Sequence, residues 1–137
     1  MYTMKMKFTS ELEERAHRSG NGEPAWRRTD AKEAVRALTV SGRAILGGEL
    51  WIVQKEKWTW GALPTAKGPT VFHWVCERKP GEPWTDYVDR SCSESLSAID
   101  ALPSEGEVDM PTESEIFYNL TWASEGEYLN LKATKRG

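Results

Sequence analysis

One long amphipathic helix restricts the fold of this chain more than any other feature of its sequence. Five apolar residues recur at steps of four, four, four and three: Trp84, Val88, Cys92, Leu96 and Ile99. This spacing aligns them along one side of an α-helix, and Pro83 suits the first turn of such a helix. The pattern predicts a helix over residues 84–101, whose apolar side must pack against another layer of the fold.

Strand patterns predict a sheet as that second layer. Residues 70–77 alternate, and Phe72, Trp74 and Cys76 share the face that we expect to lie in the core. Further strands are predicted over residues 4–9, 44–53, 115–122 and 127–132, helices over 10–18 and 30–41, and a long connection over 55–69. This order is typical of an α+β fold. We expect a single domain over residues 1–137, with a mainly antiparallel sheet and helices packed on one face.

The strand predicted over residues 44–53 is interrupted by Gly47 and Gly48. Glycine weakens a strand, and it is tolerated where the chain bulges or where another backbone approaches closely. A phosphate-binding loop also uses glycines, but the further glycines and the Lys-Ser/Thr ending of such a loop are missing from this sequence. We therefore expect a bulge or a crowded crossing at this pair.

The sequence offers little material for catalysis or for metal binding. His17 and His73 are the only histidines, and neither lies in a recognisable catalytic motif. Cys76 follows His73 by three residues in a predicted strand, so the two side chains point to opposite faces and cannot act as a thiolate–imidazole pair. Two cysteines, Cys76 and Cys92, are too few for a disulfide framework or a zinc site. We expect no enzymatic activity, no metal and no cofactor.

Neither a membrane span nor a secretory signal is visible in the sequence. It contains no apolar run of about 18 residues, and its first residues are polar. We therefore expect a cytoplasmic protein without a membrane partner, in which both cysteines are reduced thiols. No oligomeric state follows from the sequence.

Charge is unevenly distributed along the chain. The net charge is +3 over residues 1–43, −1 over residues 44–95 and −5 over residues 96–137. No lysine or arginine occurs between Arg90 and Lys132, an interval with nine acidic residues. Such a block repels nucleic acid and can steer a basic protein partner, although it can also serve only to keep a small protein soluble. The partner-binding candidates from this block are Glu105, Glu107, Asp109 and Glu113.

Two of the seven tryptophans, Trp58 and Trp60, lie in the connection predicted over residues 55–69. Because they are two residues apart in an extended segment, they share one side of it. Exposed tryptophans are enriched at binding anchors, although these two can instead fold back over the sheet as a cover for the core. We keep both as candidate aromatic anchors.

The middle of the chain resembles a known protein family. Its landmarks are the helix over residues 30–41 that runs into Gly42, the strand Ala44-Ile45-Leu46-Gly47-Gly48-Glu49-Leu50-Trp51, the strand His73-Trp74-Val75-Cys76-Glu77, and the helix near Trp84 with Tyr87, Arg90, Ser91 and Ala98. Over roughly residues 30–101 this order resembles the immunity protein 40 family of bacterial polymorphic-toxin systems. The family pattern favours asparagine where this chain has His73, and aspartate where it has Glu49.

The resemblance implies a non-enzymatic inhibitor that binds a cognate toxin domain in the cytosol of the producing cell. Many toxin domains act on nucleic acid and are basic, so an acidic surface would associate with such a domain quickly. Glu49 joins the candidate contacts on this basis. Charge reversal at residues 105, 107 and 109 together is then expected to slow association, most visibly at low salt.

Two other classes of function remain open at this point. One is a small-ligand or regulatory protein-binding module without catalytic activity, which an apolar cavity with convergent polar groups would favour. The other is a small enzyme centred on His73, which His17, Glu49 or Glu77 beside it in an open cleft would favour.

Overall fold

The computed structural model describes residues 6–54, 58–60, 62–65, 67–105, 110 and 113–136. Within these residues the chain forms, in order, the following elements: α1 (Ser10–Arg15), β1 (His17–Arg18), β2 (Pro24–Trp26), α2 (Arg28–Val40), β3 (Ala44–Gln54), β4 (Trp58–Trp60), β5 (Ala62–Thr65), β6 (Gly68–Val71), β7 (His73–Val75), α3 (Trp84–Ala101), β8 (Ser114–Ala123) and α4 (Glu125–Arg136).

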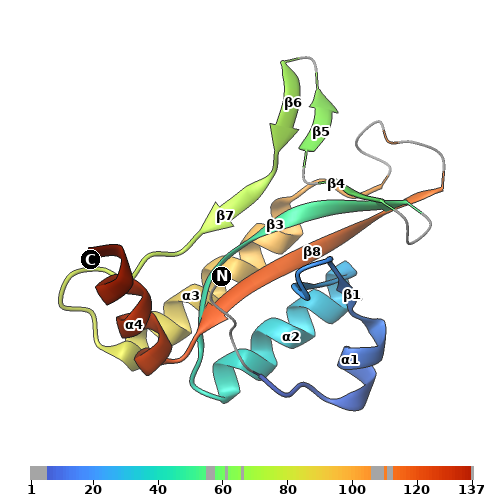
Figure 1. Cartoon of the computed structure of the whole chain (residues 1–137). Coiled ribbons are helices and arrows are strands. Elements are labelled where there is room, and N and C mark those ends of the chain that lie inside the picture. Colours follow the sequence, from blue (N-terminus) through green and yellow to red (C-terminus); the bar gives the residue numbers. More distant parts are fainter. Residues whose placement is uncertain are drawn as a thin grey trace.

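A six-stranded antiparallel sheet forms the centre of the molecule (Figure 1). Its order is β1-β2-β8-β3-β4, and β3 and β8 form the long central pair. The other edge of β3 has two partners, because β7 pairs with residues 47–49 and β4 with residues 52–54. Strands β5 and β6 form a separate hairpin that projects beyond the sheet (Figure 1).

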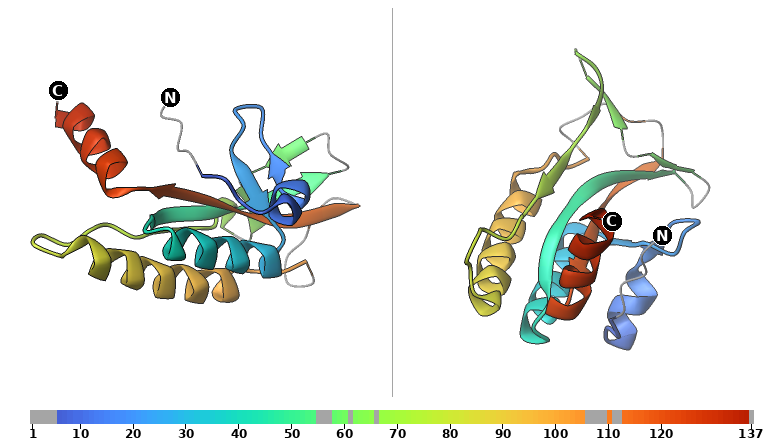
Figure 2. Two further views of the ribbon diagram at one scale, coloured as in Figure 1. Left: turned by 90° about the horizontal axis from the view of Figure 1, so that it is seen from below. Right: turned by 60° about the vertical axis from the view of Figure 1, so that its left-hand side comes forward.

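Helices α2 and α3 lie side by side on one face of the sheet (Figure 2). Alternate residues of β8, among them Ile116 and Leu120, belong to the core that also contains Val35 and Leu38 of α2. Helix α4 leaves the end of β8 on the opposite side of the sheet (Figure 2). The predicted α+β class, a mainly antiparallel sheet with helices packed on one face, is confirmed.

Helix α3 spans the residues that its apolar spacing predicts, but it is turned so that two serines are buried. Ser91 and Ser95 are 0% exposed, whereas Cys92 and Leu96 are only partly buried. The hydroxyl of Ser91 accepts a hydrogen bond from the Ile45 backbone N–H, and that of Ser95 accepts one from the indole N–H of Trp74, each at 3.0 Å. The serines are buried because they satisfy polar groups that the sheet places against α3.

The irregularity expected at Gly47 and Gly48 is present as a β-bulge. The register of β3 against β8 shifts between Ile45 and Gly47. Gly47 has a φ of +154°, and a Cβ there would lie 2.3 Å from the carbonyl oxygen of Trp74. A Cβ on Gly48 would lie 2.1 Å from the carbonyl oxygen of Asn119 and 2.4 Å from the Trp74 ring. The bulge and the crowded crossing therefore both require glycine.

The N-terminal predictions are wrong in part. Residues 6–9 form no strand, and the rest of the strand predicted over residues 4–9 lies outside the described residues. Phe8 is instead buried edge-on against Trp26, with 5.0 Å between the ring centroids. Thr9 caps α1 with its side chain, and the helix ends at Arg15, before the predicted residue 18, because the next residues pair as β1 with β2.

Residues 55–77 contain more strands than predicted. Strands β4, β5 and the start of β6 lie in the segment predicted as a connection, and the strand predicted over residues 70–77 is broken at Phe72. This break lets the chain change partners, because β6 pairs with β5 and β7 pairs with β3. The predicted faces are confirmed, since Cys76 is buried and Val71, His73 and Val75 are exposed.

The strand predicted over residues 127–132 is wrong, because these residues belong to helix α4. Ser124 and Glu127 form a capping box at the start of this helix. The backbone N–H of Ser124 donates to the Glu127 carboxylate at 2.9 Å, and the N–H of Glu127 donates to the Ser124 hydroxyl at 3.2 Å. Tyr128 then packs against α3 in a second small core, which secures the helix at the end of the sheet.

Candidate interaction surface

The face of the sheet opposite α2 and α3 collects side chains from distant parts of the sequence, and we call it the open face. The register of β3 and β8 places Glu49 beside Asn119, and Trp51 beside Phe117. His73 lies across from Glu49 on β7, so the same face continues onto the third strand. These side chains point away from the helix layer because they alternate with the core residues of their strands.

An aromatic cluster lies on the open face. The ring of His17 is 6.2 Å from that of Trp51 and 5.6 Å from that of Phe117. Trp51 is only 5% exposed, and its indole N–H donates to the carboxylate of Glu49 at 2.7 Å. The guanidinium of Arg27 lies 5.7 Å from the centre of the Phe117 ring, in cation–π contact. Through the hydrogen bond from Trp51, the cluster fixes the position of the Glu49 carboxylate, which is partly exposed.

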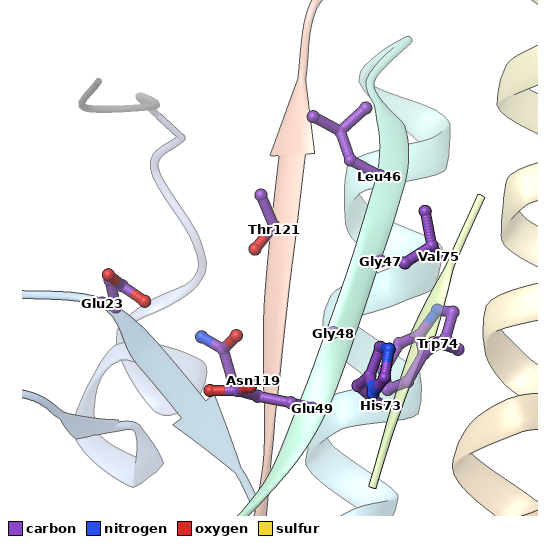
Figure 3. Close-up of a pocket in the computed structure, with 10 residues that line it drawn as sticks. All are labelled: Glu23, Leu46, Gly47, Gly48, Glu49, His73, Trp74, Val75, Asn119 and Thr121. Atoms are coloured by element: carbon purple, nitrogen blue, oxygen red, sulfur yellow. The ribbon is translucent and has the colours of Figure 1, made fainter. Parts of the chain in front are cut away.

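A groove of about 350 Å³ lies beside this cluster (Figure 3). Gly47 and Gly48 of the bulge line it, with Asn119 and Thr121 on one side of them and residues 73–75 on the other (Figure 3). Its polar groups come from four segments of the chain: Glu23, Glu49, His73, Asn119 and Thr121. No lysine or arginine is among the described residues that line it. We call this the first groove.

A second groove of about 560 Å³ adjoins the cluster at His17 and Phe117. Its lining includes Arg15 and the carboxylates of Glu14, Glu113 and Glu115. Arg15 also pairs with Asp30 of α2 at 3.2 Å. The open face thus presents an aromatic cluster and two adjoining grooves with carboxylates in their lining, and the first groove, which no described lysine or arginine lines, suits a partner with cationic side chains.

Comparison with known proteins identifies the family. Residues 15–121 match the family model described as immunity protein 40, which is more than half of the chain. The chain belongs to the immunity protein 40 family. The matched residues of this immunity protein include α2, α3, the bulge and the whole first groove. The resemblance predicted from the sequence is confirmed. No curated protein and no solved structure matches the chain.

Five carboxylates of the acidic block of this immunity protein form ion pairs within the molecule. In the described residues the ion pairs join Glu94 to Arg90, Asp100 to Lys32, Glu105 and Glu115 to Arg27, and Glu125 to Arg78. Two of these four cations, Arg27 and Lys32, belong to the N-terminal part of the chain, which carries the net positive charge. These five carboxylates therefore do not form the unpaired acidic surface that the sequence suggests.

Glu105 shows most clearly how such a carboxylate is used. It accepts hydrogen bonds from the backbone N–H of Ile116 at 2.7 Å and from the guanidinium of Arg27. Burial alone would raise the pKa of Glu105, but the backbone N–H groups of Ile116 and of Glu105 itself, together with Arg27, lower this pKa below its ordinary value. In the described contacts Glu105 holds the start of β8 against the residue that precedes α2.

The other candidates predicted from the sequence fall in different places. Glu49 lines the first groove and Glu113 the second, so both lie on the open face but not together. Glu107 and Asp109 lie outside the described residues. Trp58 and Trp60 lie in strand β4 and not in a loop, opposite Gln54 and Ile52 of β3, and their side chains are outside the described part.

Sequence reasoning missed Glu23, Asn119 and Thr121 as lining residues of the first groove. The strand predicted over residues 115–122 was enough to place two of them, Asn119 and Thr121, on one face of the sheet. Its period of two places Asn119 and Thr121 on the same face as Phe117, opposite the apolar core positions. Glu23 lies in the turn before β2, and no local pattern could place it beside residues of β3 and β8.

The histidines and cysteines of the immunity protein are also placed. His73 and Cys76 are on opposite faces, as predicted, because His73 is exposed and Cys76 is 3% exposed in the core. Burial raises the pKa of the Cys76 thiol, and both cysteines are free thiols.

Among the described residues, no three His, Cys, Asp or Glu side chains are grouped to hold a metal ion. No described helix has the length and apolar character to cross a bilayer.

Proposed function

We propose that this member of the immunity protein 40 family is a cytoplasmic inhibitor that binds a cognate, basic toxin domain and neutralises it without catalysis. The family match over residues 15–121 carries the proposal. An inhibitor of this kind needs a surface that recognises one protein and not a set of groups that move protons or attack a substrate. The role therefore fits a chain whose polar groups gather on one face of a sheet.

The open face supports the proposal as a contact surface. Protein interfaces combine buried aromatic anchors with polar and charged groups around them, and complementary charge raises the rate of association. Glu49 and Glu113 are the proposed contacts in the two grooves. Glu107, Asp109, Trp58 and Trp60 stay proposed contacts, and Glu105 contributes through the position that it gives to the segment before β8.

The direct test uses the toxin domain encoded by the reading frame next to that of the immunity protein. We expect co-expression of the two to restore growth of cells that the toxin domain alone arrests, and the purified pair to form a stable complex in calorimetry. A toxin domain that neither binds the immunity protein nor is inhibited by it would overturn the proposal.

The charge part of the proposal has its own test. Glu107→Lys/Asp109→Lys should slow association with the toxin domain several-fold at low salt, and the difference should shrink as salt is added. This variant keeps Glu105, because charge reversal there would also break the hydrogen bonds that Glu105 accepts from Arg27 and from the backbone N–H of Ile116. Glu33→Lys/Asp86→Lys, on exposed positions of the helix layer, makes the same change of charge elsewhere. Equal association rates for the two variants would remove residues 107 and 109 from the contact surface.

A further inference from the structure

We propose that the first groove is the receptor for one arginine side chain of the toxin domain, an inference that rests on the proposed function. The groove has room for a long side chain, and its lining includes the oxygen acceptors of Glu23, Glu49, Asn119 and Thr121. A guanidinium fits such a site because it carries five N–H donors in one plane and no acceptor.

Asn119 supplies the most deeply placed acceptor. This residue is only 4% exposed, and its side-chain N–H₂ donates to the Pro24 carbonyl at 2.9 Å. That hydrogen bond turns the amide nitrogen toward β2 and leaves the oxygen on the side of β3 (Figure 3). No donor among the described residues bonds this oxygen, and it is not one of the buried side-chain atoms without a partner, so it stays accessible from the groove and can accept a hydrogen bond from a ligand. The groove is therefore prepared for a hydrogen-bond donor.

Glu49 and Glu23 supply negative charge on the two sides of Asn119 (Figure 3). One oxygen of Glu49 already accepts the indole N–H of Trp51 at 2.7 Å, which fixes the carboxylate and leaves its second oxygen for a partner. In the described part of the chain neither Glu23 nor Glu49 forms an ion pair, in contrast to the paired carboxylates of the acidic block. Their charge is thus available to an incoming cation.

The shape of the lining favours arginine over lysine. The acceptors come from three strands and a turn, so they approach a ligand from several directions. A guanidinium has five donors spread over a plane and can bond several separate acceptors, whereas an ammonium is a compact point charge with three donors. The exposed ring of His73 and the side chain of Val75 border the same groove and offer a surface for the flat group and its aliphatic stem.

The test compares two matched double variants in calorimetric titrations with the toxin domain. Glu23→Gln/Glu49→Gln removes both charges and keeps an acceptor for the Trp51 indole. Glu33→Gln/Asp89→Asn removes two charges from exposed positions on α2 and α3. We expect the first variant to bind about 30-fold more weakly or worse, because removing the charge from one side of a hydrogen-bonded interface pair costs about 2 kcal/mol or more. We expect less than about a threefold change for the second.

A second measurement uses N-acetyl-arginine amide as the probe, followed by NMR on the full chain. The indole N–H of Trp51 and the side-chain amide of Asn119 should shift with wild type and not with the Gln variant, while N-acetyl-norleucine amide should shift neither.

The outcomes separate the two proposals. Wild type that binds the toxin domain while the Gln variant binds equally well would overturn the arginine receptor and leave the proposed function standing. Wild type that does not bind the toxin domain at all would overturn the proposed function and the occupant together. Groove signals that respond equally to the arginine and norleucine amides would refute recognition of the guanidinium.

Discussion

The substitution Gly48→Ala tests whether the glycine pair is required by the crossing of β3, β7 and β8. A Cβ at this position would lie 2.1 Å from the Asn119 carbonyl oxygen and 2.4 Å from the Trp74 ring. One contact is with the backbone of β8 and the other with a side chain of β7. No single side-chain rotation relieves both, so strands must separate as well.

The size of the effect follows from these contacts. Forcing an extra carbon into a packed site costs about 1–3 kcal/mol. Rotation of the Trp74 ring would also break its 3.0 Å hydrogen bond to Ser95, which is worth about 1 kcal/mol. We therefore expect Gly48→Ala to lower the free energy of unfolding by about 3 kcal/mol. With a urea m-value of about 1.5 kcal/mol/M, the unfolding midpoint would fall by about 2 M.

Urea titration followed by tryptophan fluorescence measures this directly, and Gly126→Ala is the matched control. A Cβ at Gly126 in α4 meets nothing within 4 Å. Alanine is also the better helix former, so this control should raise the free energy of unfolding by up to about 1 kcal/mol. If Gly48→Ala stays within about 0.5 kcal/mol of wild type, the crowded crossing is not what requires the glycine.

Three further changes test other contacts. Tyr87→Phe removes the hydrogen bond from a buried hydroxyl to the Cys76 carbonyl, and we expect urea titration to show a loss of about 1–2 kcal/mol. Ser124→Ala removes the capping hydroxyl of α4 and should cost about 1 kcal/mol, with a smaller helical signal in circular dichroism. Hydrogen bonds from Arg90 lower the pKa of Glu82 from its ordinary 4.5 to about 2. Because the folded-state pKa is depressed, this pair stabilises the protein above about pH 4.5 and is lost as the pH falls toward 2. The stability difference between wild type and Glu82→Gln should close across that interval, and a difference that does not depend on pH would contradict this account.

Local patterns in the sequence predicted the secondary structure correctly in segments where one periodicity dominates. The apolar spacing predicts α3 over its full length, and the β3 and β8 strands are predicted to within one residue at each end. The strand predicted over residues 127–132 failed because the helix start is encoded just before it, in the capping box of Ser124 and Glu127. The four-residue capping box starts a helix, whereas the residues that follow it had been predicted to form the second strand of a hairpin.

The candidate contacts depend on information of another kind. The sequence by itself determined the helix layer, the central strands β3 and β8, the irregularity at Gly47 and Gly48 and the family, because each is encoded by neighbouring residues or by their order. Only the tertiary structure decided which carboxylates are neutralised, since Glu105 is 78 positions away from its partner Arg27. It also brought Glu23, Glu49 and Asn119 to one groove. Which charges pair and which side chains share a surface depend on how close the residues lie in space. The pairing of the strands sets these distances.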